Sequence, residues 1–427
     1  MAIWTILLAA LVLLGSSLWV GLSLIGIGVA GLEIFKQMPV LRLLGQDVWT
    51  SLTAPELVAL PLFILMGDIL FHTRLAEQLF RGLAPWVSPI PGRLVHVNIV
   101  GSTIFAAASG SSAATAATIG KITLPELLKR GYDPAIAMGS LAGAGALGLL
   151  IPPSLVLIVY GVLTGVSVLQ LFAAGIVPGL LLAFCFSLYV TIRSLLKPGL
   201  IPEGVERTSL AQKLRSTLGL VPMMGLIVLV IGSMYAGYAT PSEAAVMGVF
   251  GSLLIAGMQR VLSVKLLFTA IVSCVRTCAM LGLILAGALF LAKALAFLNI
   301  PTQVGSAVAA MELTPVALIC VLIVFYVILG CFLDGTSMIV MTLPVTFPLV
   351  VAAGYDPVWF GIFLVLVAEM GAVTPPVGFN LFVVQSLTGA KLGEVAVATA
   401  PFFFVMLVFT LLITVFPEIV LWLPGGA

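Results

Sequence analysis

The sequence contains few charged residues and almost no histidine. Only 8% of its 427 residues are Asp, Glu, Lys or Arg, and there are two histidines. An ordinary soluble domain carries roughly a quarter charged residues, and nucleic-acid binding requires basic clusters that are missing here. Five cysteines lie in apolar runs. Cys274 and Cys278 share a helix face, but no His or further Cys accompanies them, so we expect no cysteine-based metal site.

Long apolar stretches make up most of the chain. Apolar residues account for 62% of it, and a helix of about 20 such residues crosses a hydrocarbon core of about 30 Å. The first run, residues 3–14, has no basic segment before it and no small-residue cleavage site after it. We therefore expect a retained span there rather than a signal peptide. These features predict an all-α polytopic membrane protein.

Two halves of the sequence are related by a common offset. Gly-Tyr-Asp-Pro at 131–134 recurs 223 residues later, at 354–357. The same offset relates Thr123 to Thr346, Pro125 to Pro348, Gly148 to Gly371, Pro152-Pro153 to Pro375-Pro376 and Pro178 to Pro401. We therefore predict two homologous repeats, residues 1–196 and 217–427, joined by a polar linker at 197–216.

Each predicted repeat has the same order of segments. About five apolar spans accompany a pair of apolar arms around a Gly/Ser tip, and a helix that begins at Asp-Pro is interrupted by Pro-Pro. The paired arms lie at 94–128 and 314–353, and the interrupted helices at 135–168 and 357–390. We interpret each pair of arms as a re-entrant helical hairpin, because its polar tip lies in the middle of an apolar run.

Three helix starts are predicted from capping signals. Asp133 and Asp356 each precede a proline, which fits an N-cap followed by Pro at the first helical position. Thr240 and Glu243 have the spacing of a capping box.

The distribution of basic residues indicates the orientation. Five spans per repeat, an odd number, invert the second repeat relative to the first. With the linker in the cytoplasm, thirteen Lys and Arg residues lie on the inner side and only two, Lys36 and Arg42, on the outer side. This is the asymmetry that the positive-inside rule demands, and it places both termini on the outer side.

Four helix interruptions are the expected sites of chemistry. Two are the hairpin tips, 108–112 and 333–337, and two are the Pro-Pro sequences, 148–153 and 371–376. Proline removes an amide donor and displaces carbonyls from the helical ladder, and a membrane interior tolerates such breaks only where they are buried or line a cavity. The released carbonyls and nearby hydroxyls suit a hard cation such as Na⁺, and half-helix N-termini suit an anion.

Several motifs resemble one transporter family. They are SGSSAATAATIGKITLPELLKRGYDP, GALGLLIPPS, FLDGTSMIVMTLPVTFPLVVAAGYDP and EMGAVTPPVGFNLFV, together with YATPSEAA and LVALPLFILMGD. Over essentially the whole chain they resemble the large membrane subunit of tripartite ATP-independent periplasmic (TRAP) transporters. The resemblance implies Na⁺-driven uptake of a small organic anion by an elevator movement of a transport domain against a scaffold domain. It also implies a small four-helix membrane partner, a periplasmic substrate-binding protein, and a bacterial or archaeal inner membrane with periplasmic termini.

Carried over residue by residue, the resemblance implies two ion sites, with Na⁺ as the only metal and no organic cofactor. The first site comprises Ser109, Gly110, Ser111, Ser112, Gly148, Ile151 and Pro153. The second comprises Asp334, Gly335, Thr336, Ser337, Gly371, Thr374 and Pro376. Candidates for substrate contact are Ser112, Thr115, Lys121, Arg276 and Thr336.

Some charged residues in apolar segments have two interpretations each. Lys121 either neutralises the anionic group of the substrate or extends toward the cytoplasm. Arg276 either binds the substrate anion or packs against the small membrane partner. Lys293 also lies in an apolar span and is a functional candidate. We expect structural or hydrogen-bonding roles for Asp68 and Glu369, with proton carriage as the alternative in a H⁺-coupled variant.

Three other functions are alternatives to this one. A stand-alone Na⁺:divalent-anion symporter of the same superfamily would need neither partner. An intramembrane aspartyl protease needs two carboxylates in one buried site, whereas Asp133 and Asp356 are expected near opposite membrane faces. A channel is the third alternative, but the sequence contains no motif that resembles a selectivity filter. We therefore expect a transporter and not an enzyme; dicarboxylates, sugar acids, sialic acid, keto acids and sulfonates all suit such a backbone-built site.

Overall fold

The computed structural model describes residues 12–13, 19–36, 38–202 and 209–426. These residues form helices joined by short turns, and no strand occurs among them. Six of the helices are long and apolar enough to cross a membrane, or up to eight if each of two bent pairs is one span. The predicted all-α polytopic membrane fold is therefore confirmed. The span expected at residues 3–14 lies almost wholly outside the described residues.

The helices of the first half lead to a hairpin, an interrupted helix and a long closing helix. In chain order they are α2 (Val20–Lys36), α3 (Val40–Leu52), the 3-10 turn η1 (Pro55–Val58), α4 (Ala59–Phe71), α5 (Leu75–Val87), α6 (Val95–Ser109), α7 (Ser112–Lys129), α8 (Pro134–Gly145), α9 (Leu147–Leu150), α10 (Leu155–Thr164) and α11 (Val168–Leu196). The cis peptide Pro152–Pro153 lies between α9 and α10.

The second half follows the same order. Its elements are α12 (Leu210–Thr217), α13 (Val221–Ile227), a π-helical turn (Val228–Gly232), α14 (Ser233–Tyr235), α15 (Pro241–Met258), α16 (Val264–Phe297), α17 (Ile300–Ala309), α18 (Pro315–Gly330), α19 (Gly335–Ala352), α20 (Pro357–Ala372), α21 (Phe379–Thr388), α22 (Leu392–Val415) and α23 (Glu418–Leu421). The cis peptide Pro375–Pro376 lies between α20 and α21. Most of α12 belongs to the predicted linker.

The helix α3 is not among the elements predicted from the sequence. It continues through η1 into α4 with a bend of 55°. At the repeat offset this bent pair corresponds to α16, which is a single helix of 34 residues. The bend lies at Pro55, which lacks an amide hydrogen and leaves Ala54 extended, with φ −63° and ψ 126°. The first half therefore has a bent pair of helices where the second half has one continuous helix.

All three predicted N-caps are present. Asp133 and Asp356 each accept hydrogen bonds from the backbone amides two and three residues further on, at 2.7–3.3 Å. Thr240 and Glu243 form the complete capping box. These bonds satisfy amides that the first helical turn leaves without partners, which fixes where α8, α20 and α15 begin.

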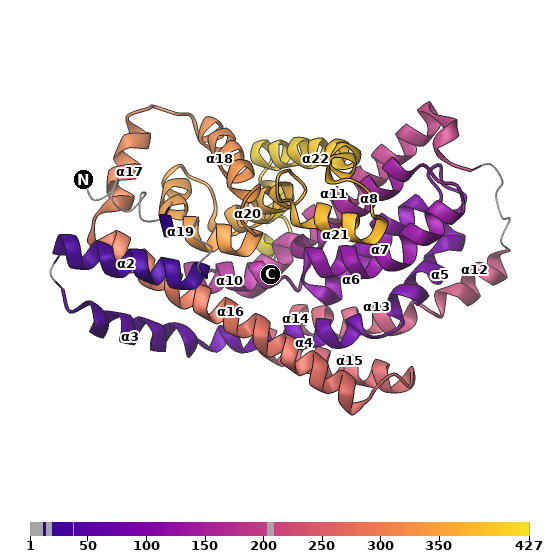
Figure 1. Cartoon of the computed structure of the whole chain (residues 1–427), viewed down its shortest axis with the longest axis horizontal. Helices are drawn as coiled ribbons and strands as arrows, with labels where there is room; N and C mark the ends of the chain where they lie inside the picture. The colour runs from indigo at the N-terminus through magenta and orange to yellow at the C-terminus, as the bar shows by residue number, and fades with distance from the viewer. Residues whose placement is uncertain (1–11, 14–18, 37, 203–208, 427) are drawn as a thin grey trace.

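The helices α2, α3, α4 and α16 lie together on one side of the molecule and the hairpins on the other. In Figure 1, α16 runs beside α2 and close to α3 and α4, while α6–α8 and α18–α22 form a second group that contacts them, here called the hairpin block. Glycines bring α2 and α16 together, since a Cβ on Gly287 would lie 2.5 Å from the Gly21 carbonyl oxygen. Such small-residue contacts are typical of helices that associate within a membrane.

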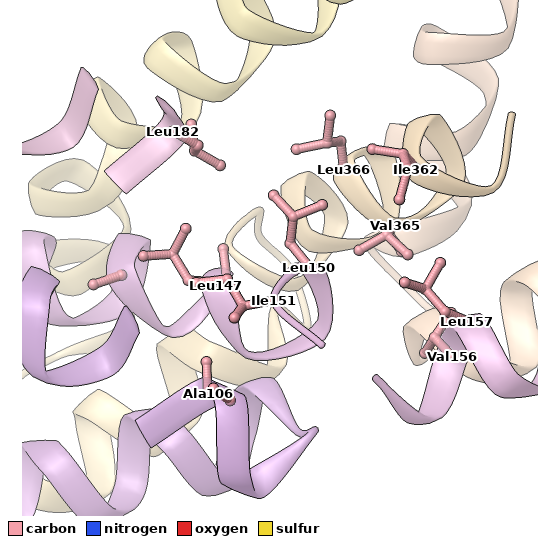
Figure 2. Close-up of a cluster of buried hydrophobic side chains, with 14 of the residues drawn as sticks. Ala106, Leu147, Leu150, Ile151, Val156, Leu157, Leu182, Ile362, Val365 and Leu366 are labelled. Atoms are coloured by element: carbon pink, nitrogen blue, oxygen red, sulfur yellow. The ribbon is translucent and has the colours of Figure 1, made fainter. Parts of the chain in front are cut away.

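The first Pro-Pro break lies in the apolar core of the hairpin block. Pro152 and Pro153 are buried, whereas Pro375 and Pro376 at the second break are exposed. Figure 2 shows the buried apolar side chains around the first break: Ala106, Leu147, Leu150, Ile151, Val156, Leu157, Leu182, Ile362, Val365 and Leu366. The two breaks are equivalent in sequence position but differ in their access to solvent.

Candidate functional site

The first hairpin, α6 with α7, turns at Gly110. This residue has a left-handed backbone with φ +60°, which glycine adopts without steric cost. Ser111 then caps α7 by accepting a hydrogen bond from the Ala114 amide. The Ser109 and Thr115 hydroxyl oxygens are 2.6 Å apart. The tip of hairpin 1 is thus held by its own hydroxyls.

The tip of hairpin 1 lies directly against the first Pro-Pro break. A Cβ on Gly148 would lie 2.6 Å from the Ser111 carbonyl oxygen, and one on Gly110 would lie 2.7 Å from the Pro153 carbonyl oxygen. Any side chain at either position would separate the two segments. The two glycines therefore let the backbone of the tip and the backbone of the break come into direct contact. The two segments predicted to form the first ion site thus lie next to each other.

The second hairpin, α18 with α19, has a carboxylate at its tip. Asp334 is exposed and caps α19 by accepting a hydrogen bond from the Ser337 amide at 3.0 Å. The Val377 amide, just after the second break, donates to the Cys331 carbonyl at 3.1 Å. The structure therefore also places the segments of the second predicted ion site next to each other.

A cavity of about 140 Å³ lies between the two hairpin tips and the α20–α21 break. Its lining includes two of the residues predicted for the first ion site, Ser111 and Ser112. It also includes three of those predicted for the second, Asp334, Gly335 and Thr336. Its lining residues are Ser111, Ser112, Ala113, Leu149, Gly330, Leu333, Asp334, Gly335, Thr336, Ala368, Glu369, Ala372, Val377, Gly378, Phe379 and Asn380. Among these described lining residues there is no Lys, Arg or His.

Three helix N-termini meet at this cavity. The helices α7, α19 and α21 begin at Ser112, Gly335 and Phe379, and each of these residues lines it. The first four amides of a helix have no partner within it, and the helix dipole adds a partial positive charge there. An anion can therefore be bound by backbone groups without a basic side chain.

A buried polar chain crosses between the two halves at the floor of the cavity. The Ser112 hydroxyl lies 2.9 Å from Glu369 Oε2 and 2.7 Å from Asn380 Nδ2. Glu369 is 1% exposed and Asn380 is fully buried. The amide of Asn380 can donate to Ser112, whose hydroxyl donates in turn to the carboxylate. Hairpin 1 is therefore linked by hydrogen bonds to both sides of the second break.

The predicted substrate contacts separate into two groups. Ser112 and Thr336 line the cavity. Thr115 is buried behind the tip, where it bonds Ser109. Lys121 and Arg276 are exposed on α7 and α16 and do not line the cavity. This geometry gives them no contact with a ligand bound between the tips.

Other charges in the apolar segments lie away from the cavity. Lys293 on α16 forms an ion pair with Asp47 on α3. The Asp68 carboxyl on α4 is half-buried. Asp47 was not singled out from the sequence, because α3 was not predicted.

Sequence reasoning also missed Asn380 and the position of Glu369 in the cavity. Both follow from how α20 and α21 pack on hairpin 1, which a single sequence does not specify. One signal in the sequence could have identified them: Glu369 and Asn380 are polar residues in the apolar segments on either side of Pro-Pro. Ionisable and polar residues inside a membrane commonly mark functional positions.

Comparison with known proteins gives one consistent family. The model of the family described as tripartite ATP-independent periplasmic transporter, DctM component, matches residues 5–419. A C4-dicarboxylate TRAP transporter large permease protein from Pseudomonas aeruginosa is 34% identical over 86% of this chain and 86% of its own length. An ectoine/5-hydroxyectoine TRAP transporter large permease protein from Ruegeria pomeroyi is 31% identical over 97% of this chain and 96% of its own.

A solved structure shares the fold. The YdaH transporter of Alcanivorax borkumensis aligns over 88% of both chains with a TM-score of 0.59 and 16% identity. At this identity the match supports the fold alone. The sequence relatives are named as transporter permeases, which agrees with the expectation that the chain is not an enzyme.

Proposed function

The chain belongs to the family of DctM components of tripartite ATP-independent periplasmic transporters, and on that premise we propose that it couples Na⁺ entry to uptake of a small organic anion. The observation that carries this proposal is the cavity between the hairpin tips, where carboxylate, hydroxyl and carbonyl oxygens lie beside three helix N-termini. Oxygen ligands suit a hard cation, and helix N-termini suit an anion. One small cavity thus provides for both ligands.

The donor set at the first tip fits Na⁺. The Ser111 and Pro153 carbonyls approach glycines that leave no room for a Cβ, and the Ser109 hydroxyl lies beside them. Na⁺ bound here would add a positive charge to a tip that has no charged side chain, and so favour the entry of an anion. At the second tip, Asp334 supplies a charged ligand and Thr336 a hydroxyl.

We propose an elevator movement of the hairpin block. Its support is the close packing of each hairpin on an interrupted helix, α7 of hairpin 1 on α21 and α18 of hairpin 2 on α20, in one block beside α2, α3 and α16 (Figure 1). A unit that carries the ligands between its own tips can move without breaking the site. We further propose that the chain lies in the inner membrane with both termini in the periplasm. Its proposed partners are a four-helix membrane protein and a periplasmic binding protein.

The substrate class stays broad. Relatives of similar identity are named for a C4-dicarboxylate and for ectoine, so family membership admits both carboxylates and other small organic ions. Sulfonates fit the same helix N-termini. A stand-alone symporter and a H⁺-coupled variant are the alternatives to test.

Uptake in proteoliposomes tests the proposal. The chain, its membrane partner and its binding protein would be combined, and uptake measured over a Na⁺ titration for the wild type and for Ser109→Ala, Gly148→Leu and Thr374→Leu. We expect a Na⁺ requirement in the wild type and a higher half-saturating Na⁺ concentration in the variants. Uptake that continues without a Na⁺ gradient would refute Na⁺ coupling, and uptake without the two added proteins would favour the stand-alone symporter.

A further inference from the structure

In the cluster of Glu369, Ser112 and Asn380, the hydrogen-bond acceptor atoms outnumber the hydrogens that can be donated to them. Ser112 Oγ lies within 3.0 Å of both Glu369 Oε2 and Asn380 Oδ1, but one hydroxyl carries a single hydrogen. The Asn380 amide donates to Ser112 at 2.7 Å. When Ser112 donates its hydrogen to the Glu369 carboxylate, it cannot also donate to Asn380 Oδ1.

One oxygen of Glu369 has no hydrogen-bond partner at all among the described residues. It is Oε1, which is buried, and Glu369 is one of the residues that line the cavity. A buried carboxylate is expensive unless it is paired and fully hydrogen-bonded. The described lining residues include no Lys, Arg or His that could pair with it. The charge of such a carboxylate is balanced either by a proton or by a cation that does not belong to the described chain, and the charge of the neighbouring hairpin tip favours the cation.

The two hairpin tips are unequal in charge. The tip of hairpin 2 has Asp334, whereas the corresponding tip of hairpin 1, 109–112, consists of serines and glycine. Glu369 reaches hairpin 1 through Ser112 and is thus placed to supply the negative charge that this tip lacks. A carbonyl and hydroxyl site binds a hard cation more tightly when a carboxylate joins it, since affinity rises with the ligand charge.

We propose that Glu369 is a Na⁺ ligand. Its Oε1, with Asn380 Oδ1 and the Ser112 hydroxyl oxygen, forms a cation site between hairpin 1 and the α20–α21 break. The ligands come from both halves of the chain, so a bound ion holds hairpin 1 against the second interrupted helix. This inference rests on the proposed Na⁺ coupling and adds to it a charged ligand that the motif-based sites do not contain.

Thermal unfolding of the purified full-length chain measures the binding directly. The unfolding temperature would be recorded in detergent over a titration of NaCl, at constant ionic strength with choline chloride and with KCl as a second cation. A ligand that binds only the folded state raises this temperature with concentration. The half-maximal Na⁺ concentration is compared for the wild type, Glu369→Gln, Glu369→Asp and Glu126→Gln.

Glu126→Gln is the matched control. It makes the same acid-to-amide change at the far end of α7, where Glu126 forms an exposed ion pair with Arg130 at 2.7 Å. We expect the control to behave as the wild type. Glu369→Gln keeps the shape but loses the charge, and we expect its half-maximal Na⁺ concentration to rise by at least roughly 10- to 100-fold, the loss seen when even an outer-shell partner of a metal ligand is removed. Glu369→Asp keeps the charge with a shorter reach, and we expect a smaller increase.

The outcomes separate this inference from the proposed function. If Na⁺ does not stabilise the wild type, Na⁺ binding itself is refuted. If Na⁺ stabilises the wild type and Glu369→Gln equally, only the role of Glu369 is refuted. An unchanged Na⁺ response with altered pH dependence of uptake would show that Glu369 carries a proton instead, which also refutes the inference. If Glu369→Gln does not fold, Asn380→Ala takes its place, and an unshifted Na⁺ midpoint there refutes the proposed ligand set.

Discussion

Gly330 at the end of α18 and Gly371 near the end of α20 touch through their backbones. A Cβ on Gly371 would lie 2.6 Å from Gly330 Cα, and one on Gly330 would lie 2.7 Å from Gly371 Cα. The contact joins hairpin 2 to the second break just before each chain segment leaves its helix. No flexible side chain lies between them that could move aside.

Replacement of Gly371 by alanine should therefore push hairpin 2 away from α20. We expect a loss of about 1–3 kcal/mol, the range for overpacking a close contact, and a strong loss of uptake. Gly393→Ala is the control, since nothing lies within 4 Å of its added Cβ in α22; alanine there should be neutral or stabilise by about 0.4–1 kcal/mol. Thermal unfolding and proteoliposome uptake measure both effects, and equal behaviour of the two variants would contradict the prediction.

The Lys293–Asp47 ion pair should stabilise the contact between α16 and α3. The Asp47 side chain is 7% exposed and that of Lys293 54% exposed. Lys293→Met leaves a buried carboxylate without its partner, at a cost of about 1–3 kcal/mol. Adding Asp47→Asn to Lys293→Met should recover much of this stability, because the buried charge is then gone. Thermal unfolding of both single variants and the double variant tests this; no recovery in the double variant would show that Lys293 acts through packing alone.

The N-caps Asp133 and Asp356 should contribute similarly, because they make the same bonds in the two halves. Replacement of either by alanine should lower stability by about 1 kcal/mol, and replacement by asparagine should retain most of it. Thermal unfolding of the four variants provides the comparison. Asparagine variants as unstable as the alanine variants would indicate that the charge, and not the cap bond, is what stabilises the helix start.

A negative charge at the start of α7 should exclude an anionic substrate. Ala113 lines the cavity at the first turn of α7, so Ala113→Asp would occupy the positive end of the helix dipole with the protein's own carboxylate. We expect uptake to be lost, while stability changes little, because the helix-dipole gain of about 0.3–1 kcal/mol is offset by repulsion from Asp334 and Glu369 in the same cavity. Ala113→Asn, of similar size but uncharged, should keep measurable uptake. If both variants transport equally well, the anion does not bind at this helix end.

Features that depend on local chemistry could be predicted from the sequence. The Asp-Pro and Thr-x-x-Glu caps, the Gly/Ser tips and the Pro-Pro breaks act within a few residues, and each lies where the sequence analysis placed it. The helix α3 was missed because its charged and polar residues, Arg42, Gln46 and Asp47, look like a loop between apolar spans.

The composition of the cavity could not be predicted in the same way. Glu369 and Asn380 flank the second break, yet they bond to Ser112 of the first hairpin, more than 250 positions away in the chain. Such a contact depends on how two helical units pack, and one sequence carries no direct record of it. The resemblance supplied backbone positions at the breaks but no carboxylate for the first tip.

The convergence of three helix N-termini has a consequence for how this protein can change over evolutionary time. Backbone amides persist through every substitution except proline, so a point mutation that adds no negative charge should leave the proposed attraction for anions in place. The few side chains around these amides, such as Ala113, Thr336 and Phe379, can vary as long as they add no negative charge. A lineage could in this way exchange one cargo for another while the underlying electrostatic attraction is inherited intact.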